Sequence, residues 1–193
     1  MSQNSGVMVA GLGNPGREYV RTRHNIGFLI LEALASQANL GFKNIRFEAQ
    51  CAKGVFHQRQ IILLKPQSYM NRSGFPIQKL SSYFKIQLSD IIVVHDDLDL
   101  PFGRIRVAHN RGHGGHNGIR SIIDAFGGNK AFNRVRVGVG RPRQESGAVG
   151  HVLGKFSPDE IKQLDDVVAA GADACVTLIE KGVSSAMNLI NRG

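Results

Sequence analysis

Four short polar blocks contain the residue types that could do chemistry in this chain. The first runs from Gly11 to Asn25 and carries Asn14, Tyr19 and His24 behind a turn rich in glycine and proline. Sites in α/β proteins gather where strands end and helices begin, and all four blocks occupy such places. Together they predict an active site. The other three blocks are Tyr69-Met-Asn71, His95-Asp-Asp-Leu-Asp99 and Gly112-His-Gly-Gly-His-Asn-Gly118.

His24 is the candidate general base. A base of this kind needs a carboxylate that accepts a hydrogen bond from one ring nitrogen, because that bond selects the tautomer and stabilises the imidazolium. The aspartates that follow the apolar run Ile91–Val94 can supply it. The chain has no Gly-x-Ser-x-Gly nucleophile motif. A histidine–aspartate pair without a nucleophile favours attack by an activated water molecule.

The glycine-rich block can bring backbone N–H groups close to a carbonyl oxygen or an anion. Asn117, at the expected cap of the next helix, directs an amide to the same place. A metal site built from His109, His113 and His116 is disfavoured, because no carboxylate stands at ligand spacing. We therefore expect neither a metal nor a cofactor.

A dinucleotide site is the alternative interpretation of the first block. Gly11, Gly13 and Gly16 have the spacing of the dinucleotide fingerprint. In that motif the third glycine opens a long helix, but apolar helical spacing begins here only at Ile26. Pro15 also stiffens the turn where backbone N–H groups should meet a pyrophosphate. Both features argue against a nucleotide enzyme.

The hydrophobic periodicity predicts alternating strands and helices with one inserted hairpin, and no linker or repeat divides residues 1–193. This pattern indicates a single α/β domain with a mixed sheet surrounded by helices. Strands are expected at Val7–Ala10, Val55–His57, Ile61–Lys65, Ile91–Val94, Ile105–Val107 and Arg134–Val139. Helices are expected from Asn25, over Ser73–Phe84, from Asn117 to Gly127, from Ser157 to Lys181 and over Ser184–Asn191, with a loop at 141–150.

The net charge of +9 and the isoelectric point near 10.0 favour a polyanionic partner, with nucleic acid first. No apolar run approaches the ~20 residues that span a bilayer, and no secretory leader is visible, so we expect a cytoplasmic protein without membrane contact. Cys51 and Cys175 are expected to be reduced thiols. Basic residues bracket the first and last polar blocks at Arg17, Arg21, Arg23, Arg104, Arg106, Arg111 and Arg120.

The four blocks, in their order and spacing, resemble bacterial peptidyl-tRNA hydrolases. The matching motifs are Gly-Leu-Gly-Asn-Pro-Gly-x-x-Tyr, Arg-His-Asn-x-Gly, Tyr-Met-Asn-x-Ser-Gly, His-Asp-Asp-Leu-Asp-Leu-Pro-x-Gly and Gly-Gly-His-Asn-Gly, between about Val7 and Asn191. The resemblance implies a monomeric, metal-free esterase. It would cleave the ester between a peptide and the 3′-terminal ribose of tRNA, and so recycle tRNA from aborted translation during ribosome rescue.

The resemblance also implies residue roles. His24 matches the catalytic base and Asp96 the residue that orients it. Asn14 matches the position that distinguishes blocked peptidyl-tRNA from free aminoacyl-tRNA. The positions that line the peptide and 3′-end site are Tyr19, Tyr69, Asn71 and Asn117, and the two asparagines are candidates for polarising the ester carbonyl.

The surface for tRNA phosphates is expected on Arg134 or Arg136, of which Arg136 matches the family better. The family often has a basic residue several positions before the glycine loop, where this chain has Ala108-His109-Asn110, and Arg106 or Arg111 is expected to substitute. A non-catalytic tRNA- or RNA-binding protein remains the alternative function. The absence of tryptophan weakens it, because base-stacking platforms are scarce.

Overall fold

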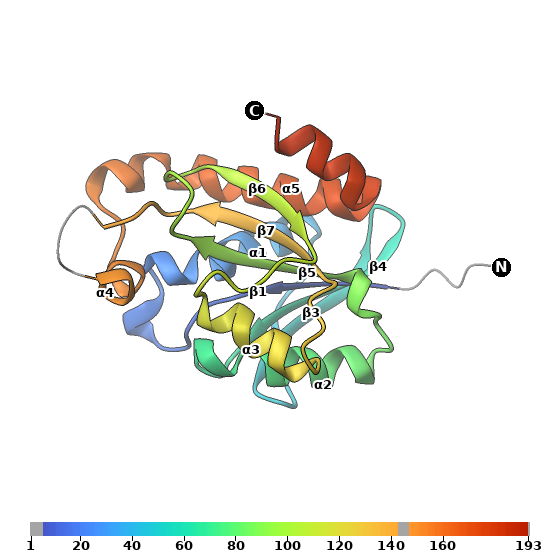
Figure 1. Cartoon of the computed structure of the whole chain (residues 1–193). Helices are drawn as coiled ribbons and strands as arrows, with labels where there is room; N and C mark the ends of the chain where they lie inside the picture. Colours follow the sequence, from blue (N-terminus) through green and yellow to red (C-terminus); the bar gives the residue numbers. More distant parts are fainter. Residues whose placement is uncertain (1–5, 143–146, 193) are drawn as a thin grey trace.

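A computed structural model describes residues 6–142 and 147–192 and contains a seven-stranded sheet between two helical layers (Figure 1). The strand order is β2-β3-β4-β1-β5-β7-β6. The four central strands β4, β1, β5 and β7 run parallel, and β3 and β6 pair antiparallel to their neighbours. The expected α/β class with a mixed sheet is confirmed. In the described part of the chain, no helix is long and apolar enough to cross a membrane.

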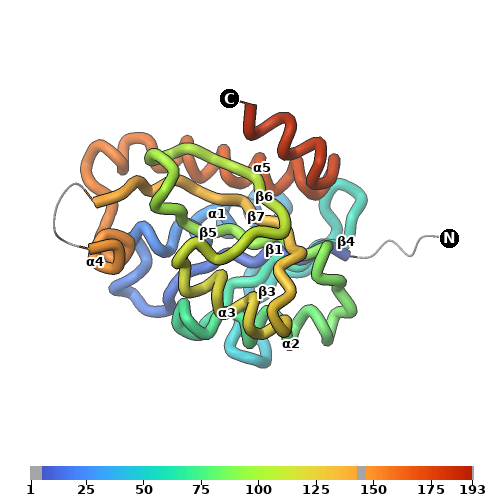
Figure 2. Tube along the Cα trace, in the orientation of Figure 1, coloured from blue at the N-terminus to red at the C-terminus, as the bar shows by residue number. Residues whose placement is uncertain are grey.

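The strands are β1 (Val7–Gly11), β2 (Lys43–Ile45), β3 (Ala49–Phe56), β4 (Arg59–Pro66), β5 (Ile91–Asp97), β6 (Ile105–His109) and β7 (Asn133–Gly138). The helices are α1 (Ile26–Gln37), α2 (Gly74–Tyr83), α3 (Asn117–Ala125), α4 (Gly147–Leu153) and α5 (Pro158–Ile190). Figure 2 follows the chain through them: α1 and α5 pack on one side of the sheet, and α2 and α3 on the other.

The central strands are buried on both faces, as the unbroken apolar run at Ile91–Val94 predicts. In β5, Ile92 and Val94 face the α1/α5 layer, whereas Ile91 and Val93 face the α2/α3 layer. β1 alternates in the same way. Two apolar cores, one on each face, therefore hold the sheet.

Several expected boundaries were wrong. β5 continues through Asp97, so His95 and Asp96 belong to the strand instead of following it. The hairpin turns at His57-Gln58, one step before the expected Gln58–Gln60, and both residues adopt left-handed backbone with φ of 47° and 61°. This conformation matches the twist of a two-residue hairpin.

The sequence pattern missed β2 and α4. β2 has only three residues and pairs at the sheet edge, which is too short for periodicity to register. Within the expected loop at 141–150, residues 143–146 lie outside the described residues, and Gly147 begins α4.

The C-terminal helices agree with expectation. Ser157 and Glu160 form a capping box, with Pro158 at the first helical position. α5 extends to Ile190, but Gly182 breaks it with φ 75° and ψ 173°, which corresponds to the two expected helices. The N-terminus of α5 stands beside the segment that carries His24.

α1 approaches the sheet closely because residue 27 is glycine. A Cβ at Gly27 would lie 2.5 Å from the backbone nitrogen of Leu12 and 2.5 Å from the carbonyl oxygen of Val94. Both atoms are main chain and cannot rotate away. Because His24 lies two residues before α1, we expect this contact to help position His24 relative to β5.

We therefore expect Gly27→Ala to destabilise the fold by about 1–3 kcal/mol, the usual cost of forcing atoms into a packed core, and to lower activity by displacing His24. Gly41→Ala is the matched control, because nothing lies within 4 Å of its Cβ position. Chemical denaturation of both variants measures the difference. Equal stabilities would contradict the close-packing explanation.

Candidate active site

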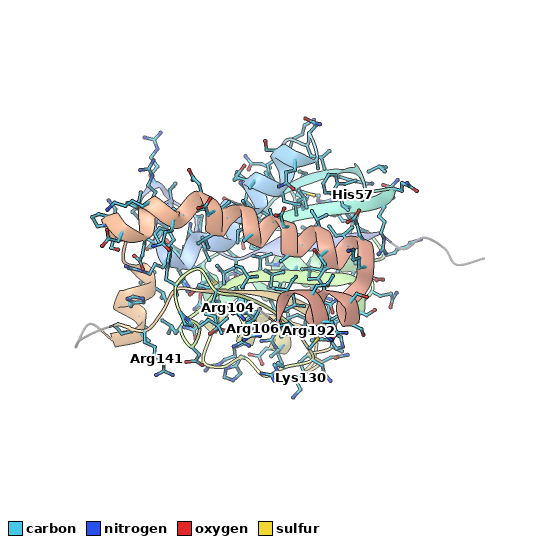
Figure 3. All side chains as sticks on the ribbon, turned by 90° about the horizontal axis from the view of Figure 1, so that it is seen from above. His57, Arg104, Arg106, Lys130, Arg141 and Arg192 are labelled. Atoms are coloured by element: carbon cyan, nitrogen blue, oxygen red, sulfur yellow. The ribbon has the colours of Figure 1, made fainter. Side chains whose placement is uncertain are left out.

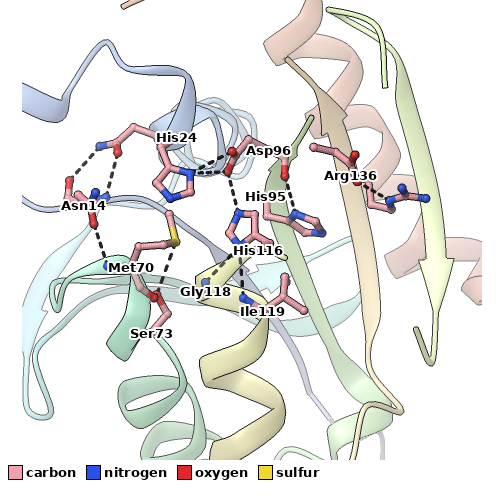
Figure 4. Close-up of polar contacts among 12 residues, drawn as sticks. Asn14, His24, Met70, Ser73, His95, Asp96, His116, Gly118, Ile119 and Arg136 are labelled. Atoms are coloured by element: carbon pink, nitrogen blue, oxygen red, sulfur yellow. Dashed lines mark hydrogen bonds and ion pairs between the residues drawn. The ribbon is translucent and has the colours of Figure 1, made fainter. Parts of the chain in front are cut away.

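The centre of the site is the carboxylate of Asp96, near the end of β5, which is only 2% exposed. His24 Nδ1 lies 2.9 Å from one of its oxygens and 3.0 Å from the other (Figure 4). An ionised carboxylate can only accept, so His24 donates from Nδ1. The other ring nitrogen of His24, Nε2, is left unprotonated in the neutral ring, and His24 lines a cavity. An imidazole and a carboxylate in this arrangement can serve as a general base and the group that orients it.

His116 is a second donor to the same carboxylate, and the sequence analysis did not assign it this role. Its Nε2 lies 2.8 Å from Asp96 Oδ1. Its Nδ1 accepts from the backbone N–H groups of Gly118 and Ile119, which makes His116 the N-cap of α3. Because Nδ1 accepts, the proton must be on Nε2.

This arrangement corrects the expectation that Asn117 caps the helix. Asn117 is instead the first residue of α3. Asparagine is a preferred cap residue and histidine is not. Residue preferences therefore predict the cap at Asn117, one residue after the actual cap at His116. The glycines before His116 were the available signal, since they allow the chain to bring its ring back over the helix end.

Opposing effects act on the pKa of Asp96. Burial alone would raise it, but the charges and N–H donors of His116 and His24 outweigh burial and hold the pKa well below its ordinary value. α1 and α3 also begin near this carboxylate from opposite faces of the sheet, and helix N-termini favour negative charge. Asp96 is therefore ionised and can stabilise a protonated His24.

Asn14 is held on three sides. Its backbone N–H donates to Asn25 Oδ1, and its carbonyl accepts from Asn25 Nδ2, both at 2.9 Å. Its side-chain Oδ1 accepts from the Met70 N–H at 2.7 Å. With Oδ1 occupied, Asn14 offers its Nδ2 donor to the cavity. Asn25 is a supporting residue that the sequence analysis did not select, although it follows His24 directly.

Arg23 anchors the segment that carries His24. Its guanidinium makes two bonds to Glu160, at 2.6 and 3.1 Å, and a third to the His151 carbonyl. Burial alone would raise the pKa of Glu160, but its bonds to Arg23 and Ser157 lower it. The position of Arg23 beside His24 predicts a role in attracting an anion; in the structure it is instead a structural tie to α5.

The cavity beside His24 and Asp96 has a volume of about 1500 Å³. The remaining residues expected at the substrate site, Tyr19, Tyr69, Asn71 and Asn117, all line it. Tyr69 is mostly exposed, whereas Asn14 at the inner wall is buried. Residues from all four polar blocks thus meet at one cavity.

The other aspartates of the third block are paired with arginines. Arg136 donates to Asp97 at 2.7 Å, and Arg141 donates to Asp99 at 2.6 Å. Asp96 therefore differs from its neighbours because it faces histidines. The two arginines thus neutralise carboxylates that line the same cavity.

The four arginines expected at tRNA phosphates have different surroundings. Arg134 and Arg136 line the cavity, as does Arg111. Arg134 is 3% exposed, donates to the Gly112 carbonyl at 2.9 Å and packs over the Phe132 ring. Arg106 does not line the cavity, and its guanidinium donates to the Asn191 carbonyl at the end of α5. Figure 3 shows Arg106 with Arg104 and Arg192 on this side of the molecule.

His24, Asp96 and His116 could also be considered as metal ligands, since their ligand atoms lie within 4.8 Å of one another. The hydrogen bonds oppose this use. A metal at His116 Nε2 would have to replace the proton there while Nδ1 still accepts from two backbone N–H groups. The donor set is therefore suited to holding a carboxylate and not a cation.

Comparison with known proteins gives a consistent family. The family model described as peptidyl-tRNA hydrolase matches residues 8–193. A peptidyl-tRNA hydrolase of Clostridium perfringens is 42% identical over 185 residues, covering 96% of this chain and 97% of that protein. One from Oceanobacillus iheyensis is 45% identical over 186 residues, covering 96% of this chain and 99% of that protein.

A solved structure agrees in fold. The crystal structure of peptidyl-tRNA hydrolase from Acinetobacter baumannii superimposes with a TM-score of 0.90 at 36% identity. The match covers 99% of this chain and 97% of that chain. Sequence and structural comparison thus point to one family.

His116 combines two roles that substitution can separate. His116→Asn keeps an N-cap side chain but loses the donor to Asp96, whereas His116→Ala loses both. Both variants should lose stability with the donor to Asp96. The alanine variant should lose about 1 kcal/mol more than the asparagine variant, the usual cost of removing a cap. Both variants should also lose activity. Thermal unfolding would measure the stabilities, and an ester-cleavage assay the activities. Full activity of His116→Asn would contradict the role of His116 as a donor to Asp96.

Asp96 also predicts a pH dependence of stability. Its pKa is lower in the folded state than the ~3.9 of a free aspartate. The folded state therefore gains stability from ionised Asp96 above about pH 4 and loses it as pH falls toward the folded pKa. The free energy of unfolding, measured by urea titration, should fall more steeply between about pH 5 and 2 in wild type than in Asp96→Asn. Parallel curves would contradict this assignment.

Proposed function

The chain belongs to the peptidyl-tRNA hydrolase family and hydrolyses the ester bond in peptidyl-tRNA; on this premise we propose that His24 is the general base and Asp96 its orienting acid. One observation carries the proposal. The 2.9 Å bond from His24 Nδ1 to Asp96 leaves the Nε2 lone pair of a cavity-lining imidazole free. A non-catalytic RNA-binding module has no need of such a pair.

In the proposed reaction, Nε2 of His24 takes a proton from a water molecule as its oxygen attacks the ester carbonyl. The carbonyl electrons move to oxygen and form a tetrahedral oxyanion. When they return, the bond to the ribose oxygen breaks, and the proton on His24 passes to that oxygen. The products are a free peptide carboxyl group and a tRNA with a free 3′ end. Asp96 stabilises the imidazolium throughout, and general-base assistance typically contributes about 10²–10⁴ in rate.

We assign the oxyanion to the side-chain amides of Asn71 and Asn117. Both line the cavity beside His24. Removal of one such donor commonly costs about 10²–10³ in rate. Asn14 is proposed to bind a peptide carbonyl through Nδ2, because Met70 occupies its oxygen. This contact would favour a blocked peptide over a free amino acid, and Tyr19 and Tyr69 would border the same subsite.

For tRNA phosphates the proposal favours Arg111 and Arg136. Both line the cavity. Arg136 is also paired with Asp97. Arg134 is buried and would contribute its positive charge from below the surface. Arg106 is a weaker candidate, because its guanidinium is turned toward Asn191. We propose further that the protein acts without a metal, as a monomeric single domain in the cytoplasm.

The function is tested with N-acetyl-aminoacyl-tRNA and its unblocked counterpart, each with and without EDTA. We expect release from the blocked substrate, little from the unblocked one, and no effect of EDTA. His24→Ala should lower kcat by at least about 10²-fold while the protein still folds. Asn14→Asp should narrow the preference for the blocked substrate, because it removes the amide donor.

His57→Ala is the control variant. His57 lies in the hairpin turn, where it pairs with Glu180 at 2.7 Å and does not line the cavity. It should keep wild-type turnover. Undiminished cleavage by His24→Ala would overturn the assignment of the base. Loss of activity in EDTA, restored by a divalent metal, would overturn the metal-free mechanism.

A further inference from the structure

His95 is a buried histidine to which the proposed reaction gives no role. It lies in β5 next to Asp96 and is only 3% exposed. Its side chain is on the face opposite that of the Asp96 carboxylate, since successive residues of a strand point to opposite faces. A buried imidazole beside the central carboxylate calls for a physical explanation.

The ring donates to the main chain of Asp96. His95 Nδ1 lies 2.7 Å from the backbone carbonyl oxygen of Asp96 (Figure 4). A carbonyl oxygen can only accept, so the proton of His95 is on Nδ1. The bond therefore ties residue 96 directly and does not depend on the orientation of the Asp96 carboxylate.

This bond substitutes for a missing strand partner. The Val94 carbonyl accepts from the Leu12 N–H at 2.9 Å, directly after the end of β1 at Gly11. Strand alternation directs the carbonyl of Asp96 to the same side as that of Val94. At that level the chain after β1 has already turned away toward Asn14 and His24. The ring of His95 supplies the donor that a longer β1 would have provided.

His95 also contacts the second donor to the carboxylate. Its ring packs edge-on against His116, with centroids 4.8 Å apart and planes at 71°. His116 in turn lies 5.1 Å from His24. His116, the ring between the other two, is therefore held by its cap bonds, by Asp96 and by His95.

The surroundings keep His95 neutral. Burial, first of all, lowers its pKa well below the ordinary value, and the charges of His116 and Arg134 lower it further against the opposing effect of Asp96. Its Nε2 is buried and has no hydrogen-bond partner among the described residues. A neutral ring protonated on Nδ1 is the form that the bond to Asp96 requires.

We propose that His95 is a positioning residue for the hydrolysis: its Nδ1–H holds the backbone of Asp96 where β1 has left the sheet, and its ring holds His116. This inference rests on the proposed roles of His24 and Asp96. It predicts that the hydrogen bond, more than the bulk of the ring, keeps the carboxylate under His24.

Two substitutions separate these contributions. His95→Phe keeps a ring against His116 but removes the donor. His95→Asn places an amide nitrogen near the position of Nδ1 but removes most of the ring. We expect His95→Phe to lower kcat by about 10- to 100-fold, the size expected when a catalytic group moves by about an ångström, with KM changed by less than about threefold. His95→Asn should recover most of this loss even if it is the less stable variant.

A spectroscopic measurement tests the positioning without relying on turnover. In protein labelled with ¹⁵N at histidine, the imidazole N–H signals of His24 and His116 report their bonds to Asp96. We expect both signals to shift or broaden in His95→Phe and to return in His95→Asn. Ile77→Val serves as the control for stability alone, because Ile77 is fully buried in α2 and does not line the cavity.

Wild-type kcat and unchanged N–H signals in His95→Phe would overturn the inference. The inference would also be overturned if kcat in both His95 variants fell only in proportion to their loss of melting temperature, as we expect for the stability control Ile77→Val. The two proposals fail differently: if His24→Ala stays active, the assignment of the base fails, whereas the N–H signals still decide the role of His95.

Discussion

A single buried carboxylate organises this structure. Asp96 must remain charged inside the protein, and a buried charge is tolerated only when it is paired and hydrogen-bonded. His24 and His116 provide its donors from segments that open α1 and α3 on the two faces of the sheet. The two helical layers thus meet at one group. Both of its donors lie at or just before the start of a helix.

The segments that carry the proposed site residues are held by hydrogen bonds between distant parts of the chain. Asn25 holds the backbone of Asn14 at both its polar groups, and Asn14 in turn receives the Met70 N–H. On the other side, Arg23 ties the approach to His24 to Glu160 of α5. Residues distant in sequence are thereby locked into one frame. Such support by neighbouring residues is what keeps a catalytic constellation within the small tolerances it requires.

The charged residues that line the cavity around Asp96 are paired in different ways. Asp97 and Asp99 are neutralised by Arg136 and Arg141, so they do not compete for the histidines. Arg134 lies deeper, and burial, followed by the nearby charges of Arg136 and Arg111, lowers its pKa to about 10. It still carries its charge at neutral pH. The cavity thus presents positive charge to an anionic substrate while its one ionised, histidine-bound carboxylate stays below the surface.

The residues alone determined much of the protein. Apolar alternation and helical spacing located the central strands and the main helices, because those patterns follow directly from backbone geometry. The four polar blocks identified the residues of the site, since glycine, proline and polar residues are needed where chains turn. Resemblance to a family then selected Asp96, which the spacing had not separated from Asp97 and Asp99.

Tertiary structure decided which groups pair. Hydrophobic periodicity predicts which face of a strand or helix a side chain occupies, but not which residue it contacts. The contacting residues come from segments far apart in the chain. This is why the sequence left the three aspartates equivalent, placed the cap at Asn117 instead of His116, and counted Arg23 among the anion-binding arginines. His95 shows the same limit, because its bond depends on the chain after β1 turning away before it reaches the level of the Asp96 carbonyl. Only the assembled sheet reveals that a carbonyl there lacks a strand partner.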